Sequence, residues 1–239
     1  MSAPAEPPTH VIVLGASRGG TTLLATALGA HPDIACLDED LTGAFDLVVG
    51  GKIRAVKLCV PNHVELTRRW TPVLTPGLWF GTTRKSLFMN RWPKSRHALT
   101  DLSRLGDVQP VGIVRDPQAV LGAIRRRENR SLKVAAYRWT RCIEVLDGLG
   151  SLAARPPLIV SFDRLVEAPE ATLTALSRAL AIAFDPAMLS APQVNRRYPN
   201  AGFDASRAAT AGAEAIDLTG LIGERTLATY RKLVAASVG

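Results

Sequence analysis

The chain is poor in cysteine and contains no long hydrophobic run, and both features limit what it can do. Its three cysteines, Cys36, Cys59 and Cys142, are far apart and form no CxxC pair, so their spacing predicts no metal site. No apolar run approaches the roughly 20 residues that span a bilayer. The first ten residues lack the basic start and the apolar core of a secretion signal. We therefore expect reduced thiols, no stable membrane insertion and a cytoplasmic location.

Aromatic residues are also scarce, at 5% of the chain, whereas the formal net charge is +8. The positive charge peaks at three consecutive arginines, residues 125–127, and continues with Arg130, Lys133 and Arg138. A basic protein can bind nucleic acid, an acidic membrane surface or a small polyanion. Few aromatics lie among these arginines and no nucleic-acid-binding module is recognisable, so we expect no nucleic-acid partner. A solvated helix face explains the same arginines equally well.

The overall composition is that of a globular protein. With 239 residues, of which 47% are hydrophobic and 21% charged, the chain fits a single domain with a large core. We expect residues 1–9 to be a disordered tail and residues 10–239 to form the domain. Two segments, at about 70–100 and 190–213, show no regular pattern and are candidates for covering a substrate. A core-packed helical insertion explains the first of them equally well.

Short apolar runs alternate with helical patterns along the chain. The expected strands are residues 11–14, 52–59, 111–114 and 158–161. The expected helices are residues 23–28, 131–149, a helix that begins at Pro169, and 219–236. This alternation predicts an α/β fold with a P-loop-like central parallel sheet and helices on both of its faces. In such sheets ligands bind beyond the carboxyl ends of the strands, where the loops at Gly15 and Arg115 lie.

The clearest chemical signal is the stretch from residue 11 to residue 39, a strand, a glycine loop and a helix. The amides of such a loop and of the helix start can hold a phosphate. The spacing Gly15-x4-Gly20 imitates a P-loop, but Thr21 stands where the P-loop lysine is required. Arg18 is the only cation within the loop. This pattern disfavours nucleoside-triphosphate chemistry and suits a ligand with a single 5′-phosphate or phosphosulfate.

Three segments resemble the PAPS-dependent sulfotransferases, where PAPS is 3′-phosphoadenosine 5′-phosphosulfate. The first is GASRGGTTLL followed by HPDI and an acidic cluster, and it is most similar to the bacterial and Golgi-type branch, which includes the tyrosylprotein sulfotransferases. The second is a strand that ends in Arg-Asp-Pro, here Arg115-Asp116-Pro117. The third and weakest is a strand followed by FDRLV, residues 162–166, in place of the family's YEDLV. The segments occur in the family's order and span most of the chain.

The resemblance implies which residues would bind the donor. The 5′-phosphosulfate would be held by Gly19, Gly20, Thr21 and Thr22. Arg18 would neutralise charge on the bridging oxygen as the sulfuryl group leaves, and Arg115 would bind the 3′-phosphate. The alternatives are structural: a loop arginine paired with a surface carboxylate, and a salt bridge at a strand end.

The chain departs from the family at the 3′-phosphate and adenine sites. Ala123, eight residues after Arg115, replaces the serine that usually binds the 3′-phosphate. Arg127 or its arginine neighbours could compensate for the lost contact. Phe162 replaces the family tyrosine and could still touch the adenine, although it lacks the hydroxyl.

Sulfuryl transfer to an alcohol also needs a base that removes the hydroxyl proton. Glu39 follows Arg18 by 21 residues, the spacing of the catalytic glutamate in the tyrosylprotein branch, and we select it over Asp38. A solvated acidic turn is the alternative. His63 is the candidate by similarity to the cytosolic branch, although we favour a surface-loop histidine there. The resemblance implies that Lys57 assists the leaving group.

The predicted function is transfer of the sulfuryl group from PAPS to a hydroxyl of a small-molecule, glycan or lipid acceptor. The nucleotide product would be PAP, 3′-phosphoadenosine 5′-phosphate, and no metal would take part. The transfer would be in-line, without a covalent intermediate. One alternative is a P-loop-type nucleotide or small-molecule kinase, against which the missing lysine argues. Another is a non-catalytic nucleotide-binding protein of the same fold, suggested by Ala123 and Phe162.

Overall fold

The computed structural model describes residues 6–39, 52–65, 97–98, 106–152, 155–190, 202–207 and 215–239. Its central sheet has five parallel strands in the order β2-β3-β1-β6-β7. They are β1 (His10–Ala16), β2 (Ile34–Asp38), β3 (Ile53–Val60), β6 (Val108–Val114) and β7 (Leu158–Ser161). A two-stranded parallel sheet contains β4 (Val64–Glu65) and β5 (His97–Ala98). The predicted α/β class with a parallel sheet is confirmed.

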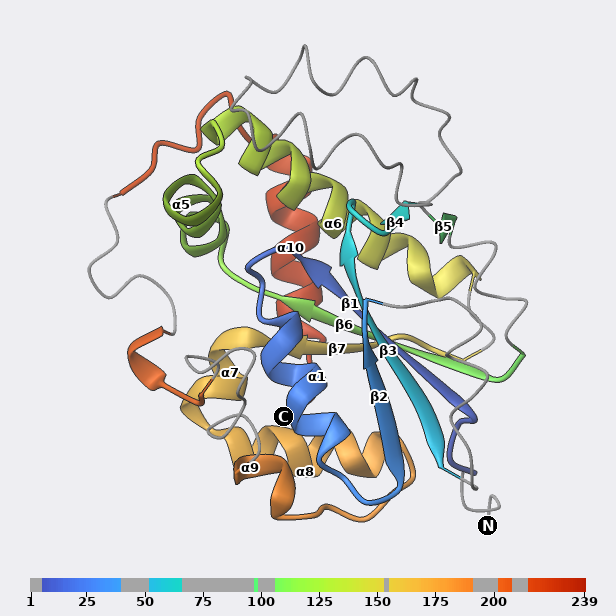
Figure 1. Ribbon diagram of the computed structural model, residues 1–239. Coiled ribbons are helices and arrows are strands. Elements are labelled where there is room, and N and C mark those ends of the chain that lie inside the picture. Colours follow the sequence, from blue (N-terminus) through green and yellow to red (C-terminus); the bar gives the residue numbers. More distant parts are fainter. Residues whose placement is uncertain are drawn as a thin grey trace.

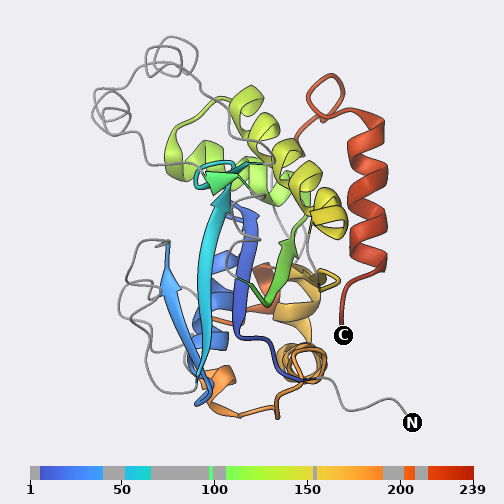
Figure 2. The ribbon, with the colours of Figure 1, turned by 90° about the vertical axis from the view of Figure 1, so that its right-hand side faces the viewer.

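Helices cover both faces of this sheet (Figure 1). One face packs against α1 (Thr21–Gly29), α7 (Phe162–Glu167), α8 (Pro169–Ala179) and α9 (Ala187–Ser190). The other packs against α5 (Pro117–Glu128), α6 (Leu132–Leu152) and α10 (Glu224–Ala235). A short 3-10 helix, η4, covers Ala205–Arg207. The quarter-turn view shows α10 as the outermost helix on its side of the sheet (Figure 2).

The central strand β1 shows why the sequence forms this layered structure. Val11 and Val13 are fully buried in the core on the α1 side, whereas Ile12 and Leu14 are buried in the core on the α6 side. A strand that is buried on both faces is therefore a continuous apolar run rather than an alternating one. The run stops where the glycine loop begins, between the two helical layers.

The strand register brings three loops to one edge of the sheet. Ala16, the last residue of β1, is paired with Val60 of β3, and Gly15 is paired with Ile113 of β6. The carboxyl ends of β1, β3 and β6 therefore lie at the same edge. This is the edge at which parallel α/β sheets bind ligands.

Two boundaries differ from the sequence-based expectation. The residues just before Glu39, where no strand was expected, form the edge strand β2, in which Ile34 is paired with Ile53. The last helix was expected from residue 219, which is wrong: it begins at Glu224. Gly220, with a φ of 72°, belongs to a turn that a right-handed helix cannot include. The expected helix 131–149 is confirmed as α6, although it extends to Leu152.

Several expected segments lie partly or wholly outside the described residues. Of the proposed tail, residues 6–9 are described, and the Thr9 carbonyl accepts a hydrogen bond from the Arg54 amide at 3.0 Å. The proposed covering segments, 70–100 and 190–213, lie outside except for residues 97–98, 190 and 202–207. Among the described helices, none is both long enough and apolar enough to span a bilayer.

Candidate active site

The glycine loop joins β1 to α1 by a tight turn. The Gly19 amide donates to the Ala16 carbonyl at 2.9 Å, and both Arg18 (φ 65°) and Gly20 (φ 101°) are left-handed. A Cβ on Gly20 would lie 2.3 Å from the Phe162 ring, so only glycine fits this position. In the described residues no side chain caps the start of α1. Its first amides therefore remain suited to binding an anion.

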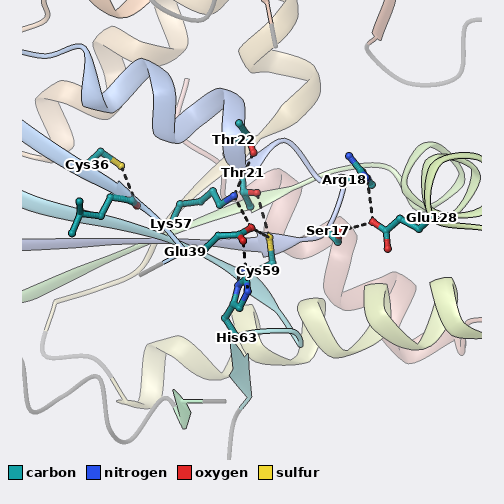
Figure 3. A network of polar contacts seen from close by, with 11 residues as sticks. Ser17, Arg18, Thr21, Thr22, Cys36, Glu39, Lys57, Cys59, His63 and Glu128 are labelled. Atoms are coloured by element: carbon teal, nitrogen blue, oxygen red, sulfur yellow. Dashed lines mark hydrogen bonds and ion pairs between the residues drawn. The ribbon is translucent and has the colours of Figure 1, made fainter. Parts of the chain in front are cut away.

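Arg18 is held by a carboxylate that the sequence did not identify. Its Nε lies 3.1 Å from Oε1 of Glu128, at the end of α5 (Figure 3). The Ser17 hydroxyl donates to the same oxygen at 2.9 Å, and Arg138 Nη1 donates to Oε2 at 2.7 Å. The structural alternative for Arg18, pairing with a carboxylate, is thus present. Its side chain remains 38% exposed, so the guanidinium is still accessible from solvent.

These contacts change the acidity of Glu128. Burial raises the pKa of the carboxyl, but the Ser17 hydrogen bond and the charges of Arg138 and Arg18 outweigh it, so the net pKa is lowered. Glu128 is therefore ionised at neutral pH and keeps its charge beside the glycine loop.

Arg115 connects the second predicted motif to the glycine loop. Its Nη1 donates to the Arg18 carbonyl at 3.1 Å, and its Cζ lies 3.9 Å from the centroid of the Phe162 ring. Trp139 Nε1 holds the Arg115 backbone by donating to its carbonyl at 3.1 Å. Phe162 is 2% exposed and packs against Gly20, so its ring supports the loop from within the protein. The structure thus brings Arg115 and Phe162 to the loop, while their roles toward the 3′-phosphate and the adenine stay predictions.

The remaining 3′-phosphate candidates lie on α5. Ala123 is half-buried, and Arg127 is exposed in the last turn of the helix. Their proposed roles stay predictions.

A second polar cluster lies at the ends of β2 and β3, on the other side of the start of α1 (Figure 3). Lys57 on β3 is 2% exposed, and its Nζ lies 3.0 Å from Oε1 of Glu39 and 3.4 Å from the Thr22 hydroxyl. Glu39 directly follows β2 in a left-handed conformation (φ 60°), and its amide donates to the Lys57 carbonyl at 3.0 Å. The β2–β3 pairing therefore positions the carboxylate, which is 32% exposed, above a buried lysine.

His63 belongs to the same cluster. Its Nε2 lies 3.8 Å from Oε2 of Glu39, and its Nδ1 accepts a hydrogen bond from the Cys59 amide at 3.0 Å. The favoured interpretation of a surface-loop histidine is wrong, because His63 is 8% exposed. Its amide donates to the Cys59 carbonyl at 2.8 Å across the short turn between β3 and β4, which keeps His63 next to the end of β3.

Cys59 is a site residue that the sequence analysis missed. Its Sγ lies 3.8 Å from Oε1 of Glu39 and 3.8 Å from the Thr21 hydroxyl. The sequence contains a signal for this position. Side chains alternate along a strand, so Cys59 shares a face with Lys57, two residues earlier, and the choice of Lys57 as a site residue therefore implies Cys59 as well.

Glu39, Cys59 and His63 together offer ligand atoms within 4.8 Å of one another, a set that can hold a transition metal. The hydrogen bonding does not suit one. A histidine that binds a metal through Nε2 carries its proton on Nδ1 and donates it to an acceptor. Here Nδ1 faces a backbone N–H donor, and the Lys57 ammonium already contacts Glu39. The cluster is better suited to holding and moving protons than to holding a cation.

We compared the chain with known proteins. Neither a protein-family model nor a curated protein matches the sequence. Among the solved structures that match, two cover nearly the whole chain. The sulfotransferase domain from the Synechococcus PCC 7002 olefin synthase is 17% identical, with a TM-score of 0.56 over 98% of each chain. The sulfotransferase domain from the curacin biosynthetic pathway is 14% identical, with a TM-score of 0.57 over 96% of this chain and 99% of that one. The chain therefore has the fold of these sulfotransferase domains.

Proposed function

We propose that this protein is a PAPS-dependent sulfotransferase that acts on a hydroxyl of a small-molecule, glycan or lipid acceptor. One observation carries the proposal: a glycine loop that lacks the P-loop lysine and opens onto the uncapped start of α1 lies beside a buried lysine that is paired with a partly exposed carboxylate. The loop suits the donor, and the Lys57–Glu39 pair suits the transfer. The shared fold supports the same function.

The donor site fits an adenosine phosphosulfate. The uncapped start of α1 offers amides and hydroxyls to the 5′-phosphosulfate, from Gly19, Gly20, Thr21 and Thr22. The proposed donor supplies an activated sulfuryl group when it is bound. Arg18 and Lys57 lie on either side of the helix start and offer positive charge to the oxygen that leaves. Arg115, at the same edge of the sheet, offers a guanidinium to the 3′-phosphate.

Glu39 is the proposed base. Its side chain is the most exposed in the cluster, at 32%, whereas the side chains of Lys57 and His63 are only 2% and 10% exposed. It would take the proton from the acceptor hydroxyl while the new S–O bond forms and the bond to the bridging oxygen breaks. As in phosphoryl transfer, the protein contributes positioning and charge.

A kinase function has less support. Asp116, the acid that follows β6, accepts a hydrogen bond from the Ala119 amide at 3.1 Å and so serves as the N-cap of α5. A carboxylate used in this way, directly after Arg115, is poorly suited to binding Mg²⁺.

The cysteines in the described residues are free thiols, in line with the proposed cytoplasmic location.

The test is ligand selectivity followed by transfer. We expect PAP to raise the melting temperature far more than ATP, ADP or AMP, because only a ligand that binds the folded state stabilises it. With PAPS and a panel of hydroxylated acceptors, Glu39→Gln should lose at least about a hundredfold in turnover while keeping the PAP-induced shift. Equal stabilisation by ATP, with Mg²⁺-dependent ATP turnover, would establish the kinase alternative instead.

A further inference from the structure

The hydrogen bond between the Cys59 amide and His63 determines which nitrogen of the imidazole ring carries the proton. The Cys59 amide has a hydrogen to donate and points it at Nδ1, so Nδ1 must present a lone pair. The proton of a neutral imidazole then resides on Nε2. That nitrogen faces Oε2 of Glu39 at 3.8 Å, a contact that can shorten into a hydrogen bond when substrate binds.

We propose that His63 is a positioning residue for Glu39, held as the Nε2–H tautomer by the Cys59 amide, and is not itself the base. The catalytic role of His63 rests on the proposed function, whereas its tautomer is independent of that function. Lys57 contacts Oε1 of Glu39 and His63 faces Oε2, so the carboxylate is held from two sides. A carboxylate fixed in this way meets the acceptor hydroxyl in one orientation.

The destination of the acceptor's hydroxyl proton distinguishes the role of Glu39 from that of His63. An acceptor hydroxyl that is attacking sulfur must give up its proton to a free lone pair. His63 has none to offer, since Nε2 already carries hydrogen and the Nδ1 lone pair is used by the Cys59 amide. Glu39 can accept the proton, because a carboxylate has about four acceptor positions and carries no proton of its own, while Lys57 and Cys59 donate to Oε1 and His63 faces Oε2. The proton therefore ends on Glu39.

The tautomer can be measured without any substrate. Nitrogen-15 NMR of histidine-labelled apo protein at neutral pH distinguishes a protonated ring nitrogen from an unprotonated one. We expect the His63 signals to show hydrogen on Nε2 and none on Nδ1. The Nε2 resonance should move in Glu39→Gln and stay in place in Glu170→Gln, a control on the exposed face of α8. A proton on Nδ1 of the neutral ring would overturn the proposal.

Two variants of His63 separate the contact of its Nδ1 with the Cys59 amide from the contact of its Nε2 with Glu39. Glutamine places an amide N–H near the position of Nε2, whereas asparagine places a carbonyl near Nδ1 and nothing near Nε2. We expect His63→Gln to retain kcat within about threefold and His63→Asn to lose about tenfold or more, with KM for PAPS little changed in both. Melting temperatures and PAP binding verify that each variant is folded.

A double-mutant cycle decides whether His63 acts through Glu39. In the Glu39→Gln background His63→Asn should cause almost no further loss, because the group that it positions is gone. If the full loss persists there, or if Gln and Asn variants are equally inactive, His63 acts independently and the proposal fails. A wild-type protein that transfers no sulfuryl group would overturn the proposed function and the catalytic part of this inference, while the spectrum would still decide the tautomer.

Discussion

Glu128 and Arg18 form an ion pair, with Oε1 of Glu128 3.1 Å from Nε of Arg18, that ties the glycine loop to the last residue of α5. Ser17 and Arg138 bind the same carboxylate, so Glu128 organises both the loop and the first turns of α6. The pair has two opposite effects on an anion site. It orients the arginine before a ligand arrives, and it keeps a negative charge close to the place where phosphate and sulfate would bind.

Removing this charge should separate binding from turnover. In Glu128→Gln we expect PAP affinity to rise by about two- to fivefold, since a repulsive charge is lost. We expect kcat to fall by about tenfold, since Arg18 is no longer oriented. Calorimetric titration with PAP and initial rates with PAPS give the two values. Glu170→Gln on α8 is the matched control and should change neither. A fall in PAP affinity would contradict this account.

The same residue should contribute to acid sensitivity. The pKa of Glu128 is lowered in the folded protein, below its ordinary value of 4.5. The folded state therefore favours the carboxylate, and its stabilising effect is complete above about pH 4.5 and is lost as pH falls through the folded-state pKa. We expect the free energy of unfolding of the wild type to decline more steeply below this pH than that of Glu128→Gln. Urea unfolding at a series of pH values tests this; parallel declines would refute it.

Gly20 should tolerate no side chain. Gly20→Ala combines a left-handed backbone with a Cβ 2.3 Å from the Phe162 ring, so we expect a loss of about 1–3 kcal/mol in the free energy of unfolding. PAP-induced stabilisation should also fall, because the ring supports both the loop and Arg115.

Gly150 provides the control for this substitution. It lies in α6 and an added Cβ would meet no atom within 4 Å, so Gly150→Ala should be neutral or stabilising by up to about 1 kcal/mol. Denaturant titration of both variants measures the contrast. Equal effects at the two glycines would mean that the Gly20 turn can relax.

Arg115 should determine the preference for a 3′-phosphate. We expect Arg115→Ala to reduce the ratio of PAP affinity to AMP affinity by about tenfold or more, the value of one charge-assisted contact. The ratio is informative because Arg115 also supports the Arg18 carbonyl, so both affinities can fall together. Titration calorimetry with PAP and with AMP measures this ratio of affinities. Arg178→Ala, exposed on α8, is the control; an unchanged ratio in Arg115→Ala would assign the 3′-phosphate to another residue.

The strands and the fold class could be predicted because buried parallel strands are continuous apolar runs that end in recognisable loops. The edge strand β2 could not, because its five residues include Asp38 and its identity depends on pairing with β3. The start of α10 was misplaced because Leu218 and Leu221 continue an apolar pattern through a turn at Gly220.

Within the site, sequence reasoning found residues but not their relationships. Glu39, Lys57 and His63 were separate candidates, and only the β2–β3 pairing and the turn after β3 bring them into contact. Glu128 gave no signal, because it is 110 positions from Arg18 and lies in an arginine-rich helix end that read as a solvated surface.

The alternation of side chains along β3 restricts how this chain can change over evolutionary time. Lys57 and Cys59 face the site, while Leu58 and Val60 face the core on the α6 side. A single-residue insertion or deletion between Ile53 and Lys57 would exchange these two sets, putting a charged group into the hydrocarbon interior and a leucine beside Glu39. A change in length by one residue before Lys57 is therefore not compatible with keeping both the site and the core of this strand.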